Sequence, residues 1–395
     1  MMRSQIHTLP PLTNAERLHS EQLTALIRDE LQRAGGWLNF ERFMELALYA
    51  PGLGYYSAGA HKLGVGGDFV TAPEVSPLFG RCVANQCAAV LATLQGGGIL
   101  ELGAGSGVMA ADMLLQLAAL NCVPEHYYIL EVSADLRARQ QNLLQQRVPH
   151  LFHRLQWLQE LPTNFVGVIV ANEVLDALPV QRFCIIQGAV QALGVTCDAQ
   201  QFKWQSRAPS DSLKQAVHAI SNYTGQVFAE GHHSEINLRL TPWIHSLAAA
   251  LQRGAMLFID YGLSQAEYYA AARMHGTLAC FFRQRMHDDP FVNVGLQDIT
   301  AWVDFTAVAA AGFSAGLKLQ GFATQAHFLL GAGLDRLLTD SSEMLTAEQR
   351  WQQSQQIQKL TLPNEMGESF KVMAFAKDCD VQLSGFAFRD LRDRL

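Results

Sequence analysis

A short apolar strand at 99–102, which contains the acidic residue Glu101, leads into three glycines at alternate positions, Gly103, Gly105 and Gly107, and then into a helical stretch that begins at Val108. Glycine lets the backbone turn sharply and approach a ligand closely, and the start of the following helix offers N–H groups without intrahelical partners. This pattern predicts a loop that binds a nucleotide-type cofactor. A purely structural strand-to-helix turn is the alternative.

The residues around these glycines favour S-adenosylmethionine over a dinucleotide. The dinucleotide pattern G-x-G-x-x-G, started at Gly103, requires glycine at position 108, where the chain has Val108. A carboxylate at Glu101 fits poorly beside a pyrophosphate, whereas S-adenosylmethionine has no phosphate and carries a cationic amino group and a sulfonium. We therefore expect Glu101, Gly103, Gly105 and Gly107 to bind S-adenosylmethionine, with a dinucleotide as the alternative.

A further acid follows the next strand-like run. Ligands of an open parallel sheet bind beyond the carboxyl ends of its strands. Glu131 follows the strand expected at 127–130, at a spacing from the glycines that suits an acid accepting both ribose hydroxyls. The alternative is a solvated carboxylate at the start of the next helix.

Two carboxylates, Glu173 and Asp176, follow the strand expected at 166–171 and would share one helix face if this turn were helical. Methyltransferases that act on the amino groups of bases carry an Asn-Pro-Pro-aromatic run here, so the segment disfavours a base as acceptor. Paired acids suit a guanidinium, whose planar fork matches carboxylates bidentately. We expect Glu173 and Asp176 to be the catalytic residues. The alternatives are a merely exposed Glu173 and an Asp176 that caps the local turn.

The stretch 62–74 is too rich in glycine and proline for regular structure. Such a loop is costly to order, and binding residues are frequently found on structured loops. It carries Asp68, Thr71 and Glu74, which we expect to contribute to ligand binding.

Composition narrows the class of protein. The chain has 395 residues, of which 49% are hydrophobic, and this predicts one large domain or two. It contains neither an apolar run of the roughly 18 residues that span a bilayer nor a recognisable signal or presequence, so we expect a cytoplasmic protein. Its seven scattered cysteines and its histidines lack metal-ligand spacing. The net charge of −7 argues against a general nucleic-acid binder and favours proteins or small molecules as partners.

Strand-like runs alternate with helical ones, which predicts parallel β-α-β units in a doubly wound α/β sheet. We expect helices at 13–35, 40–48, 77–94, 108–120, 133–146 and 244–251, and strands at 99–102, 127–130, 155–158, 166–171 and 255–260. The first helix should bury Leu18, Leu23, Leu26, Ile27 and Leu31. Short β-rich runs at 182–186, 190–195 and 201–204 predict an inserted meander.

These elements predict four regions. They are N-terminal helices with a cofactor-covering loop (1–76), a core (77–179 and 243–277, with a C-terminal strand near 366–376 that closes the sheet edge), an inserted β-rich substrate region (180–242) and an accessory helical and loop region (278–365).

Several longer motifs occur in a fixed order along nearly the whole chain. They are Gly66–Ser76, Glu101–Gly107, Asn172–Pro179, Asp260–Gly262, Asp298–Phe305 and Met366–Lys371. With them the chain resembles the MidA family, also called the DUF185 or complex I assembly methyltransferase family. The segment Gly-Asp-Phe-Val-Thr-Ala-Pro-Glu is far more specific than the glycine loop, which many methyltransferases share.

The resemblance implies a Rossmann-like, S-adenosylmethionine-dependent protein arginine methyltransferase, whose mitochondrial relatives make symmetric dimethylarginine on a complex I subunit. It implies that the three glycines surround the cofactor, that Glu131 binds its ribose and Asn172 its adenosyl or methionine portion, and that Asp68, Thr71 and Glu74 lie on the loop covering the cleft. The missing presequence fits a bacterial member. The acceptor protein stays open, as does the choice between monomer and dimer. A cofactor-binding assembly chaperone without catalysis and a small-molecule O- or N-methyltransferase are the alternative functions.

Overall fold

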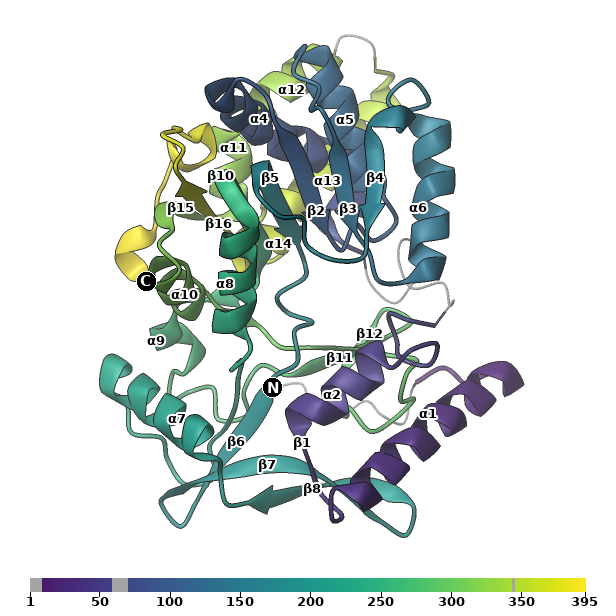
Figure 1. Ribbon diagram of the computed structural model, residues 1–395, viewed down its shortest axis with the longest axis vertical. Coiled ribbons are helices and arrows are strands. Elements are labelled where there is room, and N and C mark those ends of the chain that lie inside the picture. Colours follow the sequence, from purple (N-terminus) through teal and green to yellow (C-terminus); the bar gives the residue numbers. More distant parts are fainter. Residues whose placement is uncertain (1–8, 59–69, 343–344) are drawn as a thin grey trace. The chain divides into compact units, whose positions relative to one another are not determined.

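The computed structural model describes residues 9–58, 70–342 and 345–395 (Figure 1). They divide into a core unit (70–175, 241–263 and 305–395) and a second unit (9–58, 176–240 and 264–304). This division differs from the expected regions, since residues 70–76 belong to the core unit and residues 264–277 to the second unit. The N-terminal helices and the inserted meander belong to one unit, and the stretch 278–365 is shared between both units.

The core unit is built on a sheet with the strand order β15-β16-β10-β5-β2-β3-β4. The pairs from β4 through β10 are parallel, while β16 is antiparallel to both β10 and β15. The strands are β2 (Gly98–Leu102), β3 (Tyr127–Leu130), β4 (Leu155–Leu158), β5 (Phe165–Asn172), β10 (Leu251–Leu263), β15 (Lys318–Thr324) and β16 (Phe370–Lys377). The predicted doubly wound sheet is confirmed.

The prediction that the C-terminal strand closes the edge of this sheet was wrong. The tail strand β16 lies between β10 and β15, and β15, expected in the accessory region, forms the edge. The pairing of β15 with β16 is interrupted between Leu319 and Gly321. A Cβ on Gly321 would come within 2.1 Å of the Phe386 ring, so this position needs glycine. A glycine inside a short strand obscures its alternation, which is why the sequence pattern indicated a loop.

Helices cover both faces of the core sheet. One face packs against α4 (Pro77–Leu94), α5 (Val108–Ala119), α11 (Gln325–Gly331) and α13 (Ala347–Thr361) through a single apolar cluster. On the other face, Trp243 of α8 (Leu240–Ala250) meets Phe258 of β10 with ring centroids 5.8 Å apart, and α10 (Phe305–Ser314) packs against β16 at Phe375. The remaining helical segments are α3 (Ala72–Val75), α6 (Ala134–Arg147), α12 (Leu334–Ser342), α14 (Met366–Ser369), η2 (Phe152–Arg154), η3 (Ser384–Phe386) and η4 (Arg392–Arg394).

The second unit contains the predicted meander within an antiparallel sheet of order β1-β7-β6-β9, with β8 paired to β7. A smaller sheet has the order β12-β11-β13. The strands of these two sheets are β1 (Leu38–Asn39), β6 (Gln181–Ile186), β7 (Ala189–Asp198), β8 (Gln201–Arg207), β9 (His233–Ile236), β11 (Ala279–Phe282), β12 (Arg285–His287) and β13 (Asp298–Thr300). The short strand β14 (Val303–Asp304) belongs to neither sheet, and the helices are α1 (Asn14–Arg33), α2 (Phe40–Tyr49), α7 (Asp211–Thr224) and α9 (Gln265–Tyr268).

Two details of these helices differ from expectation. In α1, Leu23, Ile27 and Leu31 are buried as predicted, but Leu18 and Leu26 are exposed, because the buried face of the helix is narrower than the apolar pattern. Helix α7 was not predicted, although its N-cap and its buried leucine, valine and isoleucine at helical spacing follow the usual rules.

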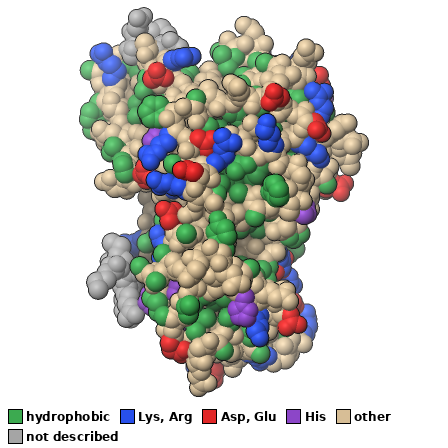
Figure 2. Space-filling model, turned by 90° about the vertical axis from the view of Figure 1, so that its left-hand side faces the viewer, with side chains coloured by type: hydrophobic (Ala, Val, Ile, Leu, Met, Phe, Trp, Pro, Cys, Tyr) green, Lys and Arg blue, Asp and Glu red, His purple; other side chains and the backbone are tan. Residues whose placement is uncertain are grey.

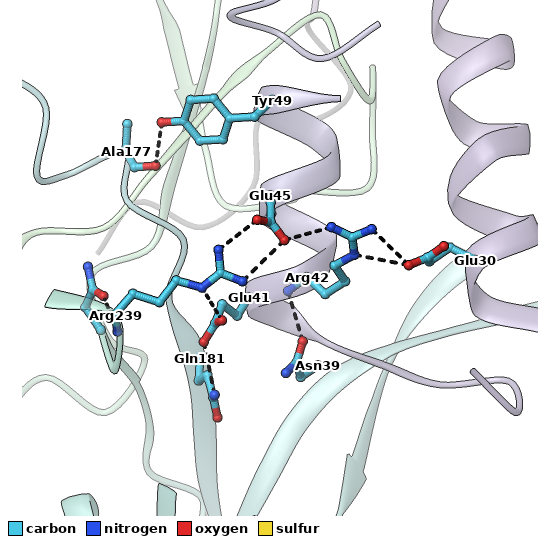
Figure 3. Close-up of polar contacts among 10 residues, drawn as sticks. Glu30, Asn39, Glu41, Arg42, Glu45, Tyr49, Ala177, Gln181 and Arg239 are labelled. Carbon is cyan, nitrogen blue, oxygen red and sulfur yellow. Dashed lines mark hydrogen bonds and ion pairs between the residues drawn. The ribbon is translucent and has the colours of Figure 1, made fainter. Parts of the chain in front are cut away.

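Ion pairs hold α2 to its neighbours in the second unit (Figure 3). Arg239 bonds Glu41 and also Glu45, the latter at 2.8 Å, and Arg42 bonds Glu45 at 2.8 Å and Glu30 at 3.0 Å. The hydrogen bond from Arg239 holds the pKa of Glu45 below its usual value. Glu45 is thus shared by two guanidinium groups from different parts of the chain.

On the face drawn in Figure 2, Lys and Arg side chains are interspersed with Asp and Glu rather than gathered into one basic area. Within the ranges that the structure describes, helices are all too short or too polar to cross a membrane. Within the same ranges, no three His, Cys, Asp or Glu side chains are grouped as metal ligands.

Candidate active site

The glycine loop joins β2 to α5 through three residues in the left-handed region. Gly103, Gly105 and Gly107 have φ values of +63°, +55° and +87°. Only glycine adopts such angles at little cost. A Cβ on Gly107 would also lie 3.4 Å from the Cα of Gln140, so α6 packs directly against this end of the loop. The predicted sharp turn at the carboxyl end of β2 is therefore present.

Glu131 lies at the carboxyl end of β3 and is only 7% exposed. It accepts hydrogen bonds from the backbone N–H of Ser133 at 2.9 Å and from Nε2 of Gln140 at 3.0 Å. The same Nε2 donates to the carbonyl of Gly105 at 3.0 Å. The structure thus brings Glu131 and the glycine loop together through the buried side chain of Gln140.

The end of β5 carries Asn172 and Glu173. Glu173 has a φ of +52°, a conformation that costs a residue with a side chain about 1–3 kcal/mol. Its N–H donates to the carbonyl of Ile259 at 2.8 Å. Its Oε1 accepts from Nδ2 of Asn172 at 3.1 Å and from the N–H of Ala72, at the start of α3, at 3.2 Å.

The turn after Glu173 is fixed by Asp260, which is completely buried at the carboxyl end of β10. Its two carboxylate oxygens accept from the N–H groups of Leu175 and Tyr261, both at 2.9 Å. The segment after β5 is therefore an irregular turn and not a helix. The condition under which Glu173 and Asp176 would share a helix face is therefore not met, because the residues after Glu173 form a turn.

Helix α3 connects two parts of this site. Glu74 accepts a hydrogen bond from Oγ of Ser106 in the glycine loop, while the first N–H of α3 reaches Glu173. Thr71 is the residue preceding this helix, and its side chain makes no capping bond. The predicted residues Thr71 and Glu74 therefore lie next to the glycine loop and the end of β5. Residues 72–75, expected to be irregular, form a short helix that Pro73 helps to start.

Glu101 points into the apolar core on the α4 and α5 side of the sheet. It is 1% exposed and accepts a hydrogen bond from the Tyr127 hydroxyl at 2.7 Å. Burial raises the pKa of Glu101 to about 7, although the bond from Tyr127 lowers it. The predicted contact of Glu101 with the cofactor stays a prediction.

Two other predicted residues are not among the described residues of the core unit. Asp68 lies outside the described residues. Asp176 belongs to the second unit, where its backbone carbonyl accepts from the N–H of Ala301 at 3.0 Å. Near it, Tyr56 donates to both carboxylate oxygens of Asp298 at 3.0 Å. Burial, followed by the negative charges of Asp298 and Asp176, raises the pKa of Tyr56 well above its usual value.

Comparison with known proteins identifies the family. Residues 82–323 match the model of a family described as S-adenosyl-L-methionine-dependent methyltransferases. A crystal structure of a COG1565 superfamily protein from Burkholderia thailandensis, bound to S-adenosylhomocysteine, is 41% identical and superposes with a TM-score of 0.93 over 98% of this chain and 100% of that chain. The chain belongs to this methyltransferase family.

Curated relatives of this methyltransferase include mitochondrial proteins. The protein arginine methyltransferase NDUFAF7 of Danio rerio is 26% identical over 371 residues, which are 86% of this chain and 83% of the relative. The human protein of the same name is 27% identical over 381 residues, which are 87% of this chain and 80% of the relative. The predicted family, fold class, cofactor and enzyme class are confirmed.

The described residues of the methyltransferase fit its cofactor, S-adenosylmethionine. The glycine loop leaves backbone accessible, and the carboxylate of Glu131 is fixed beside it. Oδ1 of Asn172 is buried and accepts no hydrogen bond from any residue that the structure describes. A buried acceptor without a donor is costly, so this atom suits a donor from a ligand, such as an amino or hydroxyl group.

Sequence reasoning missed Gln140 and gave Asp260 no role. Gln140 lies four residues from Leu136 and four from Leu144, both buried, so it occupies a polar position within the apolar stripe of α6. Asp260 lies within β10 and directly follows the apolar run 255–259. In both cases a polar side chain at a buried position was the available signal, because such groups are nearly always hydrogen-bonded.

Proposed function

We propose that this methyltransferase methylates the guanidinium group of an arginine in a protein. The proposal rests above all on Glu173, which directly follows β5. Its carboxylate accepts hydrogen bonds from Asn172 and from the first N–H of α3, the helix that also contacts the glycine loop through Glu74. The names of the mitochondrial relatives as protein arginine methyltransferases support it. The acceptor protein is left open by these observations.

The proposed mechanism needs the protein mainly to position its acceptor. When bound, S-adenosylmethionine supplies an electrophilic methyl group on a sulfonium. Glu173 would accept hydrogen bonds from the guanidinium and orient one nitrogen, an effect that can contribute up to roughly 7–11 kcal/mol when two reactants are aligned. The bonds from Ala72 and Asn172 keep the carboxylate of Glu173 in one place before the acceptor arrives. Either Asp176 or Glu74 is the proposed partner of Glu173, and residues 180–242 are the proposed acceptor-binding region.

Methyl-label transfer tests the activity. The protein, supplied with S-adenosylmethionine labelled in its methyl group, is added to a lysate from a strain that lacks it, and the labelled residue is identified by mass spectrometry. Label on protein arginine is the expected result. Label on another residue type or on a small molecule contradicts the acceptor class. Binding of S-adenosylhomocysteine without any label transfer favours an assembly chaperone.

Glu173→Gln tests the role of the carboxylate. Glutamine keeps the shape but removes the charge that holds a guanidinium, so label transfer should fall strongly while affinity for S-adenosylhomocysteine changes by less than about twofold. Asp176→Asn is the matched comparison, and it should affect transfer only if Asp176 is the partner. Full transfer activity in Glu173→Gln would pass the role to Glu74 or Asp68.

A further inference from the structure

The side chain of Gln140 makes three hydrogen bonds while being completely buried in α6. Its Nε2 donates to the carbonyl of Gly105 and to Oε2 of Glu131, both at 3.0 Å. Its Oε1 accepts from the indole Nε1 of Trp157 on β4 at 2.9 Å. One amide therefore joins the glycine loop, the end of β3 and the edge strand of the core sheet.

Chemistry fixes the orientation of this amide. An indole N–H can only donate, so the atom facing Trp157 must be the carbonyl oxygen of Gln140. The amino group then faces a backbone carbonyl and a carboxylate, which both accept. Each hydrogen-bonding atom of the amide has a matching partner, and a flipped amide would place donor against donor and acceptor against acceptor. Trp157 thus sets the direction in which Gln140 donates.

Packing adds to these bonds. A Cβ on Gly107 would lie 3.4 Å from both Cα and Cγ of Gln140, so the loop rests on the stem of this side chain while its carbonyl at Gly105 is held by the amide. Glu131 is held from both sides, because its other oxygen accepts from the N–H of Ser133. The loop and the acid are consequently ordered relative to each other without help from a ligand.

We infer that Gln140 is a positioning residue for the binding of S-adenosylmethionine. It acts by holding the Gly105 carbonyl and the Glu131 carboxylate in place. The three glycines of the loop have no side chains that could hold the backbone in one conformation, and glycine backbone can adopt many conformations. When the loop is already ordered, binding of the cofactor no longer has to offset the conformational entropy that ordering the loop would cost. The inference concerns cofactor binding and does not depend on which acceptor is methylated.

Calorimetry with S-adenosylhomocysteine tests the inference on Gln140→Leu, which keeps the volume but removes all three bonds. The Kd should rise about ten- to a hundredfold, because a buried carboxylate loses a charge-assisted donor. Gln86→Leu is the matched control. Gln86 is also a buried glutamine, but it bonds Ser384 and Gly385, away from the glycine loop. Its Kd should stay within about twofold of the wild type, although both variants should lose stability to urea.

Two further measurements separate positioning from a general loss of structure. Trp157→Phe keeps an aromatic ring but removes the donor that orients the amide, together with part of the packing of the indole. The Kd should rise about two- to fivefold, and the loss of stability to urea should be smaller than in Gln140→Leu. In a double-mutant cycle with Glu131→Ala, the combined loss should be smaller than the product of the single losses, because the two residues act through one contact. A wild-type Kd in Gln140→Leu, or an equal loss in Gln86→Leu, overturns the inference. If Gln140→Leu does not fold, an unchanged Kd in Trp157→Phe overturns it.

Discussion

Replacing Glu101 by glutamine tests how the core holds the carboxylate of β2. Burial raises the pKa of Glu101 from its ordinary value of 4.5 to about 7, against the lowering by the Tyr127 bond. Between these two values the folded protein holds a proton that the unfolded chain has lost. The stability contributed by this group is therefore fully present below pH 4.5, and it is lost as the pH rises through about 7.

The size of the effect follows from this interval. Each pH unit between the two pKa values corresponds to about 1.4 kcal/mol, so the free energy of unfolding should fall by about 3 kcal/mol because of Glu101. Glutamine has the same shape and stays neutral throughout. The stability of Glu101→Gln relative to the wild type should therefore rise by about 2–3 kcal/mol between about pH 5 and about pH 8.

Urea unfolding of both proteins across this pH range measures the difference directly. Tyr127→Phe provides a second check, since it removes the hydrogen bond that lowers the pKa of Glu101 and should move the loss of stability to higher pH. A difference between wild type and Glu101→Gln that stays constant from about pH 5 to about pH 8 would refute a pKa raised by burial. Affinity for S-adenosylhomocysteine, measured on the same samples, tests the predicted contact of Glu101 with the cofactor.

Two other perturbations have defined outcomes. Gly105→Val should abolish binding of S-adenosylhomocysteine in calorimetry, because a β-branched residue is strained at a φ of +55°. Gly188→Val is the control, since Gly188 has a φ of +70° and lies in a hairpin with open space around it. This variant should lose stability but bind S-adenosylhomocysteine normally. The hydrogen bond from Arg239 lowers the pKa of Glu45 in the folded protein, so the stability that Glu45 contributes is present above its ordinary pKa and is lost as the pH falls. This contribution should be about 1 kcal/mol or less, because the ion pair is partly solvated. Glu45→Gln should remove this acid sensitivity, which urea unfolding at about pH 4 and about pH 7 measures.

Local pattern was sufficient for the elements that carry the cofactor loop. The strands ending at Leu102, Leu130 and Leu158 are short apolar runs bounded by glycine or polar residues, and the structure has them at nearly the expected bounds. Each of these elements is determined by residues that are neighbours in the sequence. The glycine loop was predictable for the same reason, because its conformation depends on the missing side chains of the loop itself.

Long-range pairing was not predictable in this way. The place of β16 between β10 and β15 depends on which edge a distant strand joins, and the sequence of the tail is compatible with either position. The turn after Glu173 depends on Asp260, which is far away along the chain, so the local sequence left open whether this turn is helical. Whether a polar residue is buried likewise depends on the hydrogen-bond partner that it finds in the folded chain. The residues next to it in the sequence do not identify this partner.

The cofactor loop illustrates why its supporting residues are harder to recognise than the loop. Glycines at alternate positions provide space and turning freedom, but they cannot hold the loop in one conformation. The chain holds it from two sides: Gln140 on α6 bonds Gly105, and Glu74 on α3 bonds Ser106. Both supports also contact the carboxylates of the site. Gln140 donates a hydrogen bond to Glu131, and α3, which carries Glu74, donates one from the Ala72 N–H to Glu173. The position of the loop is therefore coupled to the carboxylates proposed to bind the ribose and the acceptor. A substitution of Gln140 should therefore change cofactor binding even though, on this account, it removes no atom that contacts the cofactor.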